Sequence, residues 1–433
     1  MTPGARVTAA IEILAEIETR RRPAPDALKD WGLGHRFAGS GDRAAIAGLV
    51  YDALRRRASS AHLMGEATPR AVVLGMLKRE RGLDTDAIAR LADGSGYAPA
   101  ALTEAERARL TAASMADAPP HVLGDYPAWL DPHLAQVFGG ERAEEGVALS
   151  SRAPLDLRVN TLKAERDEDV GALAELHAEP TRWSPQGLRI RLAADAKSPA
   201  IHAEPAFIKG LVEIQDEGSQ LAALLAGAKP GEQVLDLCAG CGGKTLAMAA
   251  TMQNKGQLYA TDDDKRRLAP IHERLARSGA RNVQVRTPKS VGTELADLEG
   301  RIDLVLIDAP CTGTGSWRRN PDAKWRMRPG ALEQRGKEQA EILDRAVPLL
   351  KAGGRIAYVT CSVLDEENGA QVRAFVARHP QFTVDKPAEV AGALGERAYL
   401  FTHAALVSAE GLLMTPRRTD TDGFFVAMLR HRG

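Results

Sequence analysis

The second half of the chain alternates regularly between strand-like and helix-like segments, and this alternation constrains the fold more than any other feature. From about residue 206 onward, short apolar segments with strand character alternate with longer amphipathic segments. Strands are expected at 234–238, 256–262, 283–286, 302–308, 355–361 and 424–429, and helices from about 244, 264, 330 and 365. Strands separated by helices of this length form parallel βαβ units. We therefore expect an α/β fold in which residues 206–433 form a Rossmann-like domain, with the last strand closing its sheet.

Residues 1–115 have a different, helical character. Ile13, Leu14 and Ile17 belong to an apolar pattern with helical spacing, and residues 42–57 form a second such pattern with a basic end. The patterns predict an all-α N-terminal domain, whose basic face either is simply solvated or binds RNA. Glycine and proline residues between 94 and 120 predict a linker after it.

Residues 121–205 are expected to form a small α/β domain. Their patterns predict the following elements: strands at 155–160 and 188–192, and a helix at 170–177. Three arginines lie on the expected strands: Arg158, Arg189 and Arg191. These side chains could contact phosphate, although keeping edge strands soluble is the simpler role for any one of them.

The composition narrows the class of partner. The formal net charge is +0 over 433 residues, and aromatic residues make up only 4%. Nucleic-acid binding would therefore have to come from local basic patches and from phosphate and shape contacts, not from many stacking platforms. No segment has the apolar length of a membrane span, and the chain, with its four cysteines, needs no disulfides. We expect a monomer in a reducing cytoplasm.

A glycine-rich turn follows the first expected strand of the Rossmann-like domain. Residues 236–245 (DLCAGCGGKT) lead from a strand into a helix, so the backbone can approach a ligand at the helix N-terminus. The second strand ends at Asp262, whose carboxylate can accept the hydroxyls of a ribose. The alternative for Asp262 is a helix N-cap, a role that Asp263 and Asp264 share. The spacing of the turn disfavours the NAD and P-loop motifs.

Two of the four cysteines stand at the ends of neighbouring expected strands. Cys311 follows the strand 302–308, and Cys361 ends the strand 355–361. In a parallel sheet both positions lie at the carboxyl edge, where ligands bind. A single cysteine here would most simply be a small buried hydrophobic residue, but a pair at this edge indicates thiol chemistry. The pair Cys238 and Cys241 could be half of a zinc site, but the other two cysteines form no second such pair, and we expect no metal.

A basic segment with two tryptophans lies between the two cysteines. Residues 317–328 (WRRNPDAKWRMR) combine aromatic and cationic side chains that suit the backbone and bases of single-stranded RNA. The alternative is a solvated loop that Trp325 anchors to the core.

Several motifs resemble those of a known family. They are, in the order of the family, 215–220 (QDEGSQ), 308–311 (DAPC), 318–325 (RRNPDAKW), 360–362 (TCS) with 366–368 (EEN), and 422–425 (DGFF). By these motifs the chain resembles the RNA cytosine-5 methyltransferases of the NOL/NOP/Sun group, in particular the bacterial RsmB-like ribosomal RNA enzymes. The resemblance covers roughly residues 120–433 well and is weaker before them. It implies a Rossmann-like methyltransferase domain, a small α/β RNA-binding subdomain and a NusB-like helical RNA-binding domain.

The resemblance also implies a chemistry. The cofactor would be S-adenosyl-L-methionine and the acceptor carbon 5 of a cytosine in RNA, with small-subunit ribosomal RNA expected and transfer RNA as the alternative. In the family, the cysteine that matches Cys361 is the nucleophile and the one that matches Cys311 assists product release. Asp308 is expected to protonate or hydrogen-bond the ring nitrogen. An alternative of another class is a non-catalytic RNA-binding assembly factor that keeps the fold.

The expected cofactor contacts follow from the turn, from the strand ends and from the family. They are Cys238, Ala239, Gly240, Cys241, Gly242, Gly243, Lys244, Asp262, Arg267 and Asp308. Two positions depart from the family's pattern. Gly240-Cys241 replaces the usual Ala-Pro, and Lys289 stands where the family has an acid near the adenine.

Overall fold

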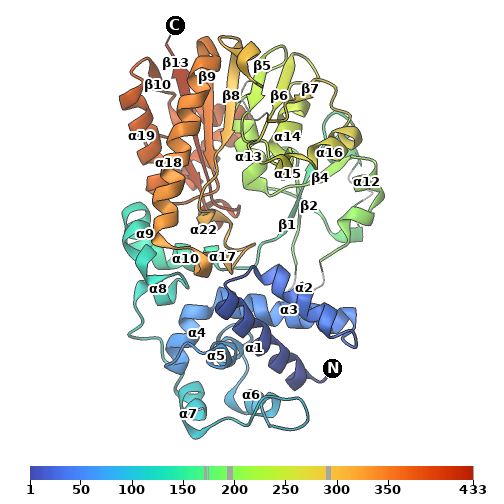
Figure 1. Ribbon diagram of the computed structural model, residues 1–433, viewed down its shortest axis with the longest axis vertical. Coiled ribbons are helices and arrows are strands. Elements are labelled where there is room, and N and C mark those ends of the chain that lie inside the picture. Colours follow the sequence, from blue (N-terminus) through green and yellow to red (C-terminus); the bar gives the residue numbers. More distant parts are fainter. Residues whose placement is uncertain (170–172, 174, 193–197, 289–293, 433) are drawn as a thin grey trace. The chain divides into compact units, whose positions relative to one another are not determined.

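The chain forms two compact units. The computed structural model describes residues 1–432 apart from 170–172, 174, 193–197 and 289–293 (Figure 1). The helical unit comprises Met1–Arg152 together with Trp317–Met327, and the sheet unit comprises Ala153–Leu192, Ser198–Ser316 and the chain from Arg328 onward. The basic segment that follows Cys311 therefore belongs to the helical unit, although the sheet unit flanks it in sequence. The three-domain boundaries expected from the sequence stay a prediction.

The helical unit is built from short helices around one apolar core. Its first helices are α1 (Pro3–Arg20), α2 (Ala24–Gly34), α3 (Ser40–Arg55), α4 (Arg57–Met64), α5 (Pro69–Arg79), α6 (Thr85–Leu91) and α7 (Glu104–Ala112). They are followed by α8 (Pro120–Leu123), α9 (Asp131–Phe138) and α10 (Arg142–Leu149). Residues 71–77 of α5 are all buried, which is expected for a helix that is apolar on every side.

The linker expected between residues 94 and 120 contains a helix instead. Helix α7 begins with a capping box, in which Thr103 and Glu106 satisfy each other's backbone N–H groups. Its Leu110 is buried in the core shared with α1 and α5. The glycines and prolines that predicted a linker therefore mark the turns on either side of a packed helix.

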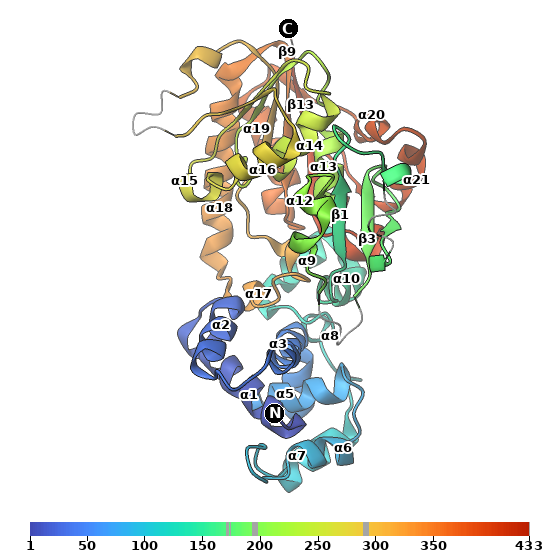
Figure 2. The ribbon, with the colours of Figure 1, turned by 90° about the vertical axis from the view of Figure 1, so that its right-hand side faces the viewer.

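A small antiparallel sheet begins the sheet unit. Its strands are β1 (Leu155–Val159), β2 (Glu179–Pro180), β3 (Gly187–Ile190) and β4 (Val212–Ile214), in the order β2-β3-β1-β4. Figure 2 shows β1 and β3 side by side. Both expected strands of this part are confirmed. The helix expected at 170–177 falls largely on residues outside those that the structure describes.

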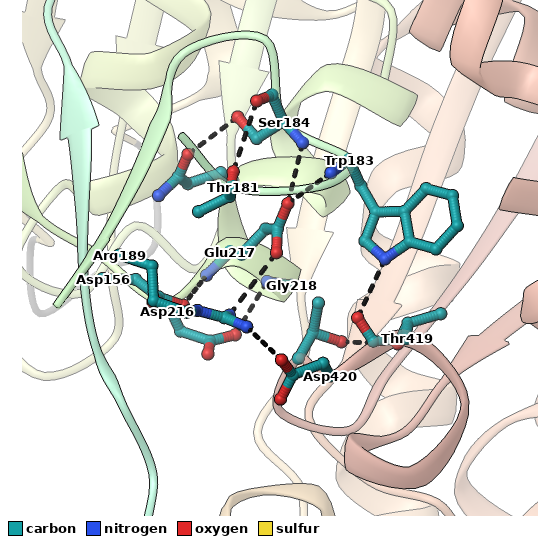
Figure 3. Close-up of polar contacts among 12 residues, drawn as sticks. Asp156, Thr181, Trp183, Ser184, Arg189, Asp216, Glu217, Gly218, Thr419 and Asp420 are labelled. Atoms are coloured by element: carbon teal, nitrogen blue, oxygen red, sulfur yellow. Dashed lines mark hydrogen bonds and ion pairs between the residues drawn. The ribbon is translucent and has the colours of Figure 1, made fainter. Parts of the chain in front are cut away.

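One of the three expected strand arginines, Arg189, has a clear structural role. Arg189 is buried and donates two hydrogen bonds to Asp156, at 2.7 and 2.8 Å, and a third to Glu217 at 3.4 Å (Figure 3). Glu217, on helix α13 (Glu217–Leu225), accepts the backbone N–H of Trp183 at 2.7 Å. The Trp183 indole donates to the carbonyl of Thr419 at 2.8 Å. Neither a phosphate contact nor an edge strand explains Arg189, since β3 lies between two strands and the arginine ties the small sheet to α13.

The main sheet is doubly wound. Its parallel strands are β5 (Gln233–Asp236), β6 (Gln257–Ala260), β7 (Val283–Val285), β8 (Ile302–Asp308) and β9 (Leu350–Thr360). Antiparallel strands extend it: β10 (Phe382–Val384), β11 (Leu406–Val407), β12 (Leu412–Met414) and β13 (Phe424–His431). The order is β11-β12-β13-β9-β8-β5-β6-β7, with β10 pairing β13. The last expected strand is confirmed as β13, but it lies between β9 and β12 and does not close the sheet.

The strand order reverses direction at the centre of this sheet. The chain builds outward from β5 to β6 and β7 on one side and then to β8 and β9 on the other. Right-handed crossovers put the helices of the two halves on opposite faces. Accordingly α14 (Gly243–Thr251) packs with α13, whereas α18 (Pro329–Ala346) packs with α19 (Gly369–Arg378), as Figure 1 shows. Ligands bind beyond the carboxyl ends of the strands where the order reverses, here at β5 and β8.

Two expected helices are interrupted. The helix expected at 264–278 is divided at Pro270 into α15 (Lys265–Leu268) and α16 (Ile271–Ser278). The helix expected from 365 begins as a 3₁₀ turn, η8 (Asp365–Glu367), and α19 follows after a break at Asn368.

Within the described residues, no helix combines the length and the apolar character of a membrane span.

Candidate active site

The glycine-rich turn has the conformation that its sequence predicts. Between β5 and α14, Gly240 and Gly242 have φ angles of 51° and 84°, a region that favours glycine. A Cβ atom on Gly242 would lie 2.5 Å from Ile271, so this position also needs glycine for packing. The Gly240 N–H donates to Asp262 Oδ2 at 2.9 Å. The turn and the acid at the end of β6 are thus joined, which fits a nucleoside held between them.

Asp262 is not the helix N-cap. It is 3% exposed, and its Oδ1 accepts the backbone N–H of Asp264 at 2.9 Å. Asp264 itself caps α15, because its side chain accepts the Arg266 N–H. Arg267 Nη2 lies 3.7 Å from Asp262 Oδ2 and can orient that carboxylate. The geometry fits ribose binding by Asp262, and the role of both residues stays a prediction.

The residues at the beginning of the turn are largely buried, and burial changes their pKa values. Asp236 accepts the Thr245 hydroxyl at 2.6 Å, and burial raises the pKa of its carboxyl to about 7. Burial likewise raises the pKa of the Cys238 thiol well above its ordinary value, whereas Cys241 is exposed. Across the described part of the chain, no group of His, Cys, Asp and Glu side chains is arranged to hold a metal ion.

Lys244 and Asp308 form an ion pair at the switch point of the sheet. Lys244 Nζ lies 2.7 Å from Asp308 Oδ2 and 4.9 Å from the centre of the Phe424 ring. Burial alone would lower the pKa of Lys244, but the Asp308 carboxylate outweighs it and the pKa is raised. The Asp308 side chain is 33% exposed, and Lys244 is the charged donor of this pair. The expected role of Asp308 at the ring nitrogen stays a prediction.

The two strand-end cysteines meet. Strands β8 and β9 are adjacent and parallel, with Asp308 opposite Val359. The sulfur atoms of Cys311 and Cys361 lie 3.3 Å apart, and the Gly315 N–H donates to the Cys361 carbonyl at 2.9 Å. Hydrogen bonding with Cys361, followed by burial, raises the pKa of the Cys311 thiol well above its ordinary value. The sequence predicted the common edge but not the direct contact.

Two closely packed glycines, Gly315 and Gly423, support the loop that carries Cys311. The sequence analysis did not predict this contact. A Cβ atom on Gly315 would lie 2.2 Å from the Gly423 carbonyl oxygen, and the Gly423 N–H donates to the Gly315 carbonyl at 2.9 Å. The turn before β13 thus touches the Cys311 loop through the backbone of these two glycines. Gly423 lies in one of the motifs named above, which was the available signal. Glu367 and Asn368 lie in another of those motifs, 366–368.

The basic segment is anchored in the helical unit. Lys324 is buried, and its ammonium group donates to the Asp125 carbonyl at 2.6 Å and the Ser150 hydroxyl at 2.7 Å. The Trp325 indole donates to the Leu54 carbonyl at 2.7 Å. The other tryptophan, Trp317, is only 1% exposed. Trp325 anchors the segment as the alternative expected, but the segment is not a solvated loop, because Trp317 and Lys324 are buried.

This architecture and its strand-edge site define a Rossmann-like methyltransferase. The crystal structure of a methyltransferase homolog protein from Pyrococcus horikoshii superposes with a TM-score of 0.58 and 27% identity, covering 72% of this chain and 97% of that one. A second crystal structure, of PH0851, has a TM-score of 0.68 and 25% identity and covers 99% of both chains.

Family models identify the particular group. Residues 222–430 match the family described as 16S rRNA methyltransferase RsmB/F, and residues 126–197 match the ferredoxin-like domain of RsmF/B-like methyltransferases. The chain belongs to the RsmB/F methyltransferase family, as its motifs indicate. The methyl donor of this family is S-adenosylmethionine, which confirms the expected cofactor.

A curated relative agrees with this assignment. The ribosomal RNA small subunit methyltransferase B of Salmonella arizonae is 34% identical over 306 residues, which is 70% of this chain. The matched region is 66% of that enzyme's length.

Lys289, the position at which this chain departs from the family near the adenine, lies outside the described residues.

Proposed function

We propose that the protein transfers a methyl group from S-adenosylmethionine to carbon 5 of a cytosine in RNA, through a covalent adduct with Cys361. The observation that carries the proposal is the contact between the Cys311 and Cys361 sulfurs, 3.3 Å apart, at the carboxyl edge of β8 and β9. The ion pair of Lys244 and Asp308 lies nearby. Together with the two cysteines, it provides groups that can add to a pyrimidine ring, stabilise the adduct and release the product.

The cofactor would bind at the neighbouring strand ends. The backbone of the turn at Gly240 and the carboxylate of Asp262 form a joined cradle that suits a nucleoside. S-adenosylmethionine supplies an electrophilic methyl group there. Arg267 would keep the Asp262 carboxylate oriented.

The chain's own groups would perform the covalent steps. The Cys361 thiolate adds to carbon 6, and carbon 5 becomes nucleophilic enough to accept the methyl group. The Lys244 and Asp308 pair hydrogen-bonds the polar edge of the ring and stabilises the charge that develops there. Carbon 5 then loses its proton to water, the double bond between carbons 5 and 6 forms again, and Cys361 leaves as a thiolate. The Cys311 thiol stabilises that leaving sulfur by a hydrogen bond.

The division of labour between the cysteines has physical support. The raised pKa of Cys311 keeps this residue as the neutral thiol, whereas only a thiolate attacks efficiently. The favourable charge interaction of Lys244 with Cys361 suits the nucleophile. Both points favour Cys361 for attack and Cys311 for release, the order that the family resemblance implies.

Two substitutions test this order. The Cys361→Ala variant should neither methylate RNA nor form an adduct, because it lacks the sulfur that adds to the ring. The Cys311→Ala variant should accumulate a covalent protein–RNA adduct that survives denaturing electrophoresis. Methylation by Cys361→Ala at the rate of the unmodified protein would refute the nucleophile assignment.

Small-subunit ribosomal RNA is the substrate that we propose. The support is the name and 34% identity of the Salmonella relative. Bisulfite mapping of total RNA with and without the gene should reveal one or more cytosines in that RNA whose modification is lost. Loss confined to transfer RNA would support the alternative substrate, and no loss anywhere would support a non-catalytic assembly factor.

A further inference from the structure

Glu367 and Asn368 are adjacent buried polar residues to which the proposed chemistry gives no role. Glu367 ends the turn η8, and Asn368 is the residue at which the backbone breaks before α19. They are 0% and 3% exposed. Burying a carboxylate is costly unless several donors satisfy it, so the partners of Glu367 indicate what it does.

Glu367 is bonded to the loop that carries Cys311. Its Oε1 accepts the Thr312 N–H at 2.8 Å, and its Oε2 accepts the Thr312 hydroxyl. Gln339 of α18 adds a bridge, since its Nε2 donates to Glu367 Oε1 at 3.1 Å and to the Pro310 carbonyl at 3.0 Å. Pro310 and Thr312 are the sequence neighbours of Cys311. The carboxylate therefore fixes the backbone on both sides of that cysteine.

Asn368 is bonded in the same way to the segment that carries Cys361. Its Nδ2 donates to the Ser362 carbonyl at 2.9 Å, and its Oδ1 accepts the Thr360 hydroxyl. Thr360 and Ser362 are the sequence neighbours of Cys361. One amide side chain thus fixes both flanks of the second cysteine.

We propose that Glu367 and Asn368 are positioning residues with separate tasks, Glu367 for Cys311 and Asn368 for Cys361. The proposal rests on the proposed function, in which the two cysteines act at different steps. Glu367 would then control release of the methylated base, and Asn368 would control attack on the unmethylated one. The break between η8 and α19 lets two consecutive residues serve two different loops.

The spacing of the two loops depends on other contacts. The Gly315 N–H donates to the Cys361 carbonyl, and the Thr314 hydroxyl lies 3.0 Å from the Ser362 hydroxyl. These contacts join the loops to each other. Glu367 and Asn368 instead fix each loop against the turn before α19, so removal of one should disturb one cysteine more than the other.

The charge of Glu367 has a second consequence. The pKa of the Cys311 thiol is raised first by its hydrogen bond with Cys361 and by burial, and the Glu367 carboxylate raises it further. A negative charge behind the Cys311 loop therefore helps to keep Cys311 protonated. A neutral replacement should weaken this effect while leaving the shape of the site almost unchanged.

The test separates the two tasks by the step that fails. The probe is small-subunit ribosomal RNA from cells that lack the gene, with S-adenosylmethionine. Glu367→Gln should accumulate the covalent adduct, the same result that is expected of Cys311→Ala. Its multiple-turnover rate should fall by about tenfold or more, while methylation in a single turnover stays within about threefold of normal. Asn368→Asp keeps the acceptor for Thr360 but lacks the donor to Ser362, and it should slow adduct formation without accumulating adduct.

Further variants guard against a general loss of structure. Thr312→Val removes one donor to Glu367 and should show a milder form of the same adduct accumulation. Asp365→Asn, on the same turn, changes a carboxylate that pairs with the exposed Arg373, and it should behave like the unmodified protein. Thermal unfolding and S-adenosylmethionine affinity are measured for every variant.

Three results would overturn the proposal. The first is that Glu367→Gln and Asn368→Asp slow both steps equally, which is the result expected of a purely structural role. The second is that Glu367→Gln turns over normally without adduct. The third is that the two cysteine variants themselves fail to separate attack from release, which would overturn the proposed function as well. With the cysteine variants behaving as expected, either of the first two results removes only the positioning roles.

Discussion

Lys244 is buried at the carboxyl edge of the sheet, between the Asp308 carboxylate and the ring of Phe424. Its charge also interacts favourably with Cys361. A buried ammonium group is stable only where negative charge or π electrons replace water. We therefore propose that Lys244 acts on the ring adduct, whereas its expected contact with the cofactor stays a prediction.

Replacing Lys244 by methionine should therefore slow the chemical step. The variant Lys244→Met removes a charge-assisted hydrogen bond to Asp308, and such a bond contributes roughly 1.5–3 kcal/mol. Adduct formation in a single turnover should fall by at least about tenfold, because about 1.4 kcal/mol corresponds to a factor of ten. The affinity for S-adenosylmethionine, measured by equilibrium dialysis, should change little. A large loss of affinity with a normal adduct rate would return Lys244 to the cofactor site.

Sequence and structure agree best on single residues that stand at strand ends. The positions of Asp262, Cys311 and Cys361 were predictable because a parallel sheet brings all its carboxyl ends to one edge. The roles of Glu367 and Gln339 were not predictable in this way. Their hydrogen bonds join segments that are far apart in sequence, and such bonds leave no periodic pattern.

At the scale of elements, a buried ionic cluster fixes the small antiparallel sheet to α13. Arg189 of β3 connects Asp156 of β1 with Glu217 of α13 (Figure 3). The Glu217 carboxylate also accepts the backbone N–H groups of Trp183 and Ser184, at 2.7 and 2.8 Å. Two carboxylates are thus buried around one guanidinium group, so loss of the cation would leave both without their main counter-charge.

The variant Arg189→Met should be strongly destabilised. Breaking a buried ion pair by removing one partner typically costs about 3–5 kcal/mol. The matched control is Arg191→Met, since Arg191 contacts Asp420 but its side chain is 69% exposed, and exposed pairs contribute at most about 1 kcal/mol. Urea unfolding of both variants measures the difference. Equal stabilities would contradict the structural role of Arg189.

The contact between the Cys311 loop and the turn before β13 gives a second prediction at this scale. Gly315→Ala places a methyl group against the Gly423 backbone, where the Cβ position is 2.2 Å from the carbonyl oxygen. Overpacking of this kind costs roughly 1–3 kcal/mol of stability. The backbone of the Cys311 loop must move to make room for the methyl group, so the variant should also methylate RNA more slowly. Gly330→Ala is the control, because nothing lies within 4 Å of that Cβ position on α18. Unchanged activity of Gly315→Ala would show that the loop adapts.

The basic segment shows where composition misleads at the scale of elements. Residues 317–327 combine arginines, a lysine and tryptophans, which suits RNA binding as well as burial. The structure buries Lys324 against backbone carbonyls and uses the Trp325 indole as a donor. A surface loop and an anchored insertion can have the same composition, and only the acceptors that other helices present distinguish them.

At the scale of the whole molecule, chain connectivity links the candidate active site to the helical unit. Cys311 lies in the sheet unit, and the segment that begins only six residues later, at Trp317, belongs to the helical unit. The chain that leaves the Cys311 loop therefore enters the helical unit after a short stretch. Sequence periodicity predicted helical and α/β parts but could not predict that this segment crosses from one to the other, because periodicity reports on local structure alone.

The stability of the full chain should depend on the protonation of Lys324, because the ammonium group of this residue is buried. Burial lowers the pKa of this side chain to about 7, against about 10.4 for an unfolded lysine. Between these values the unfolded chain binds more protons than the folded chain, so this group makes the free energy of unfolding rise with pH. Below pH 7 the full penalty of burying the charge is present.

The comparison of the unmodified protein with Lys324→Met isolates this contribution. From pH 7 to pH 9, the free energy of unfolding of the unmodified protein should gain about 2 kcal/mol relative to the variant, since one pKa unit corresponds to about 1.4 kcal/mol. Urea unfolding of the full chain at several pH values measures it. Lys337→Met is the control, because Lys337 is exposed and paired with Glu333 on the surface of α18, and its curve should run parallel to that of the unmodified protein. A parallel curve for Lys324→Met would instead mean that Lys324 keeps an ordinary pKa, and that its ammonium group is solvated and not buried among the carbonyls of the helical unit.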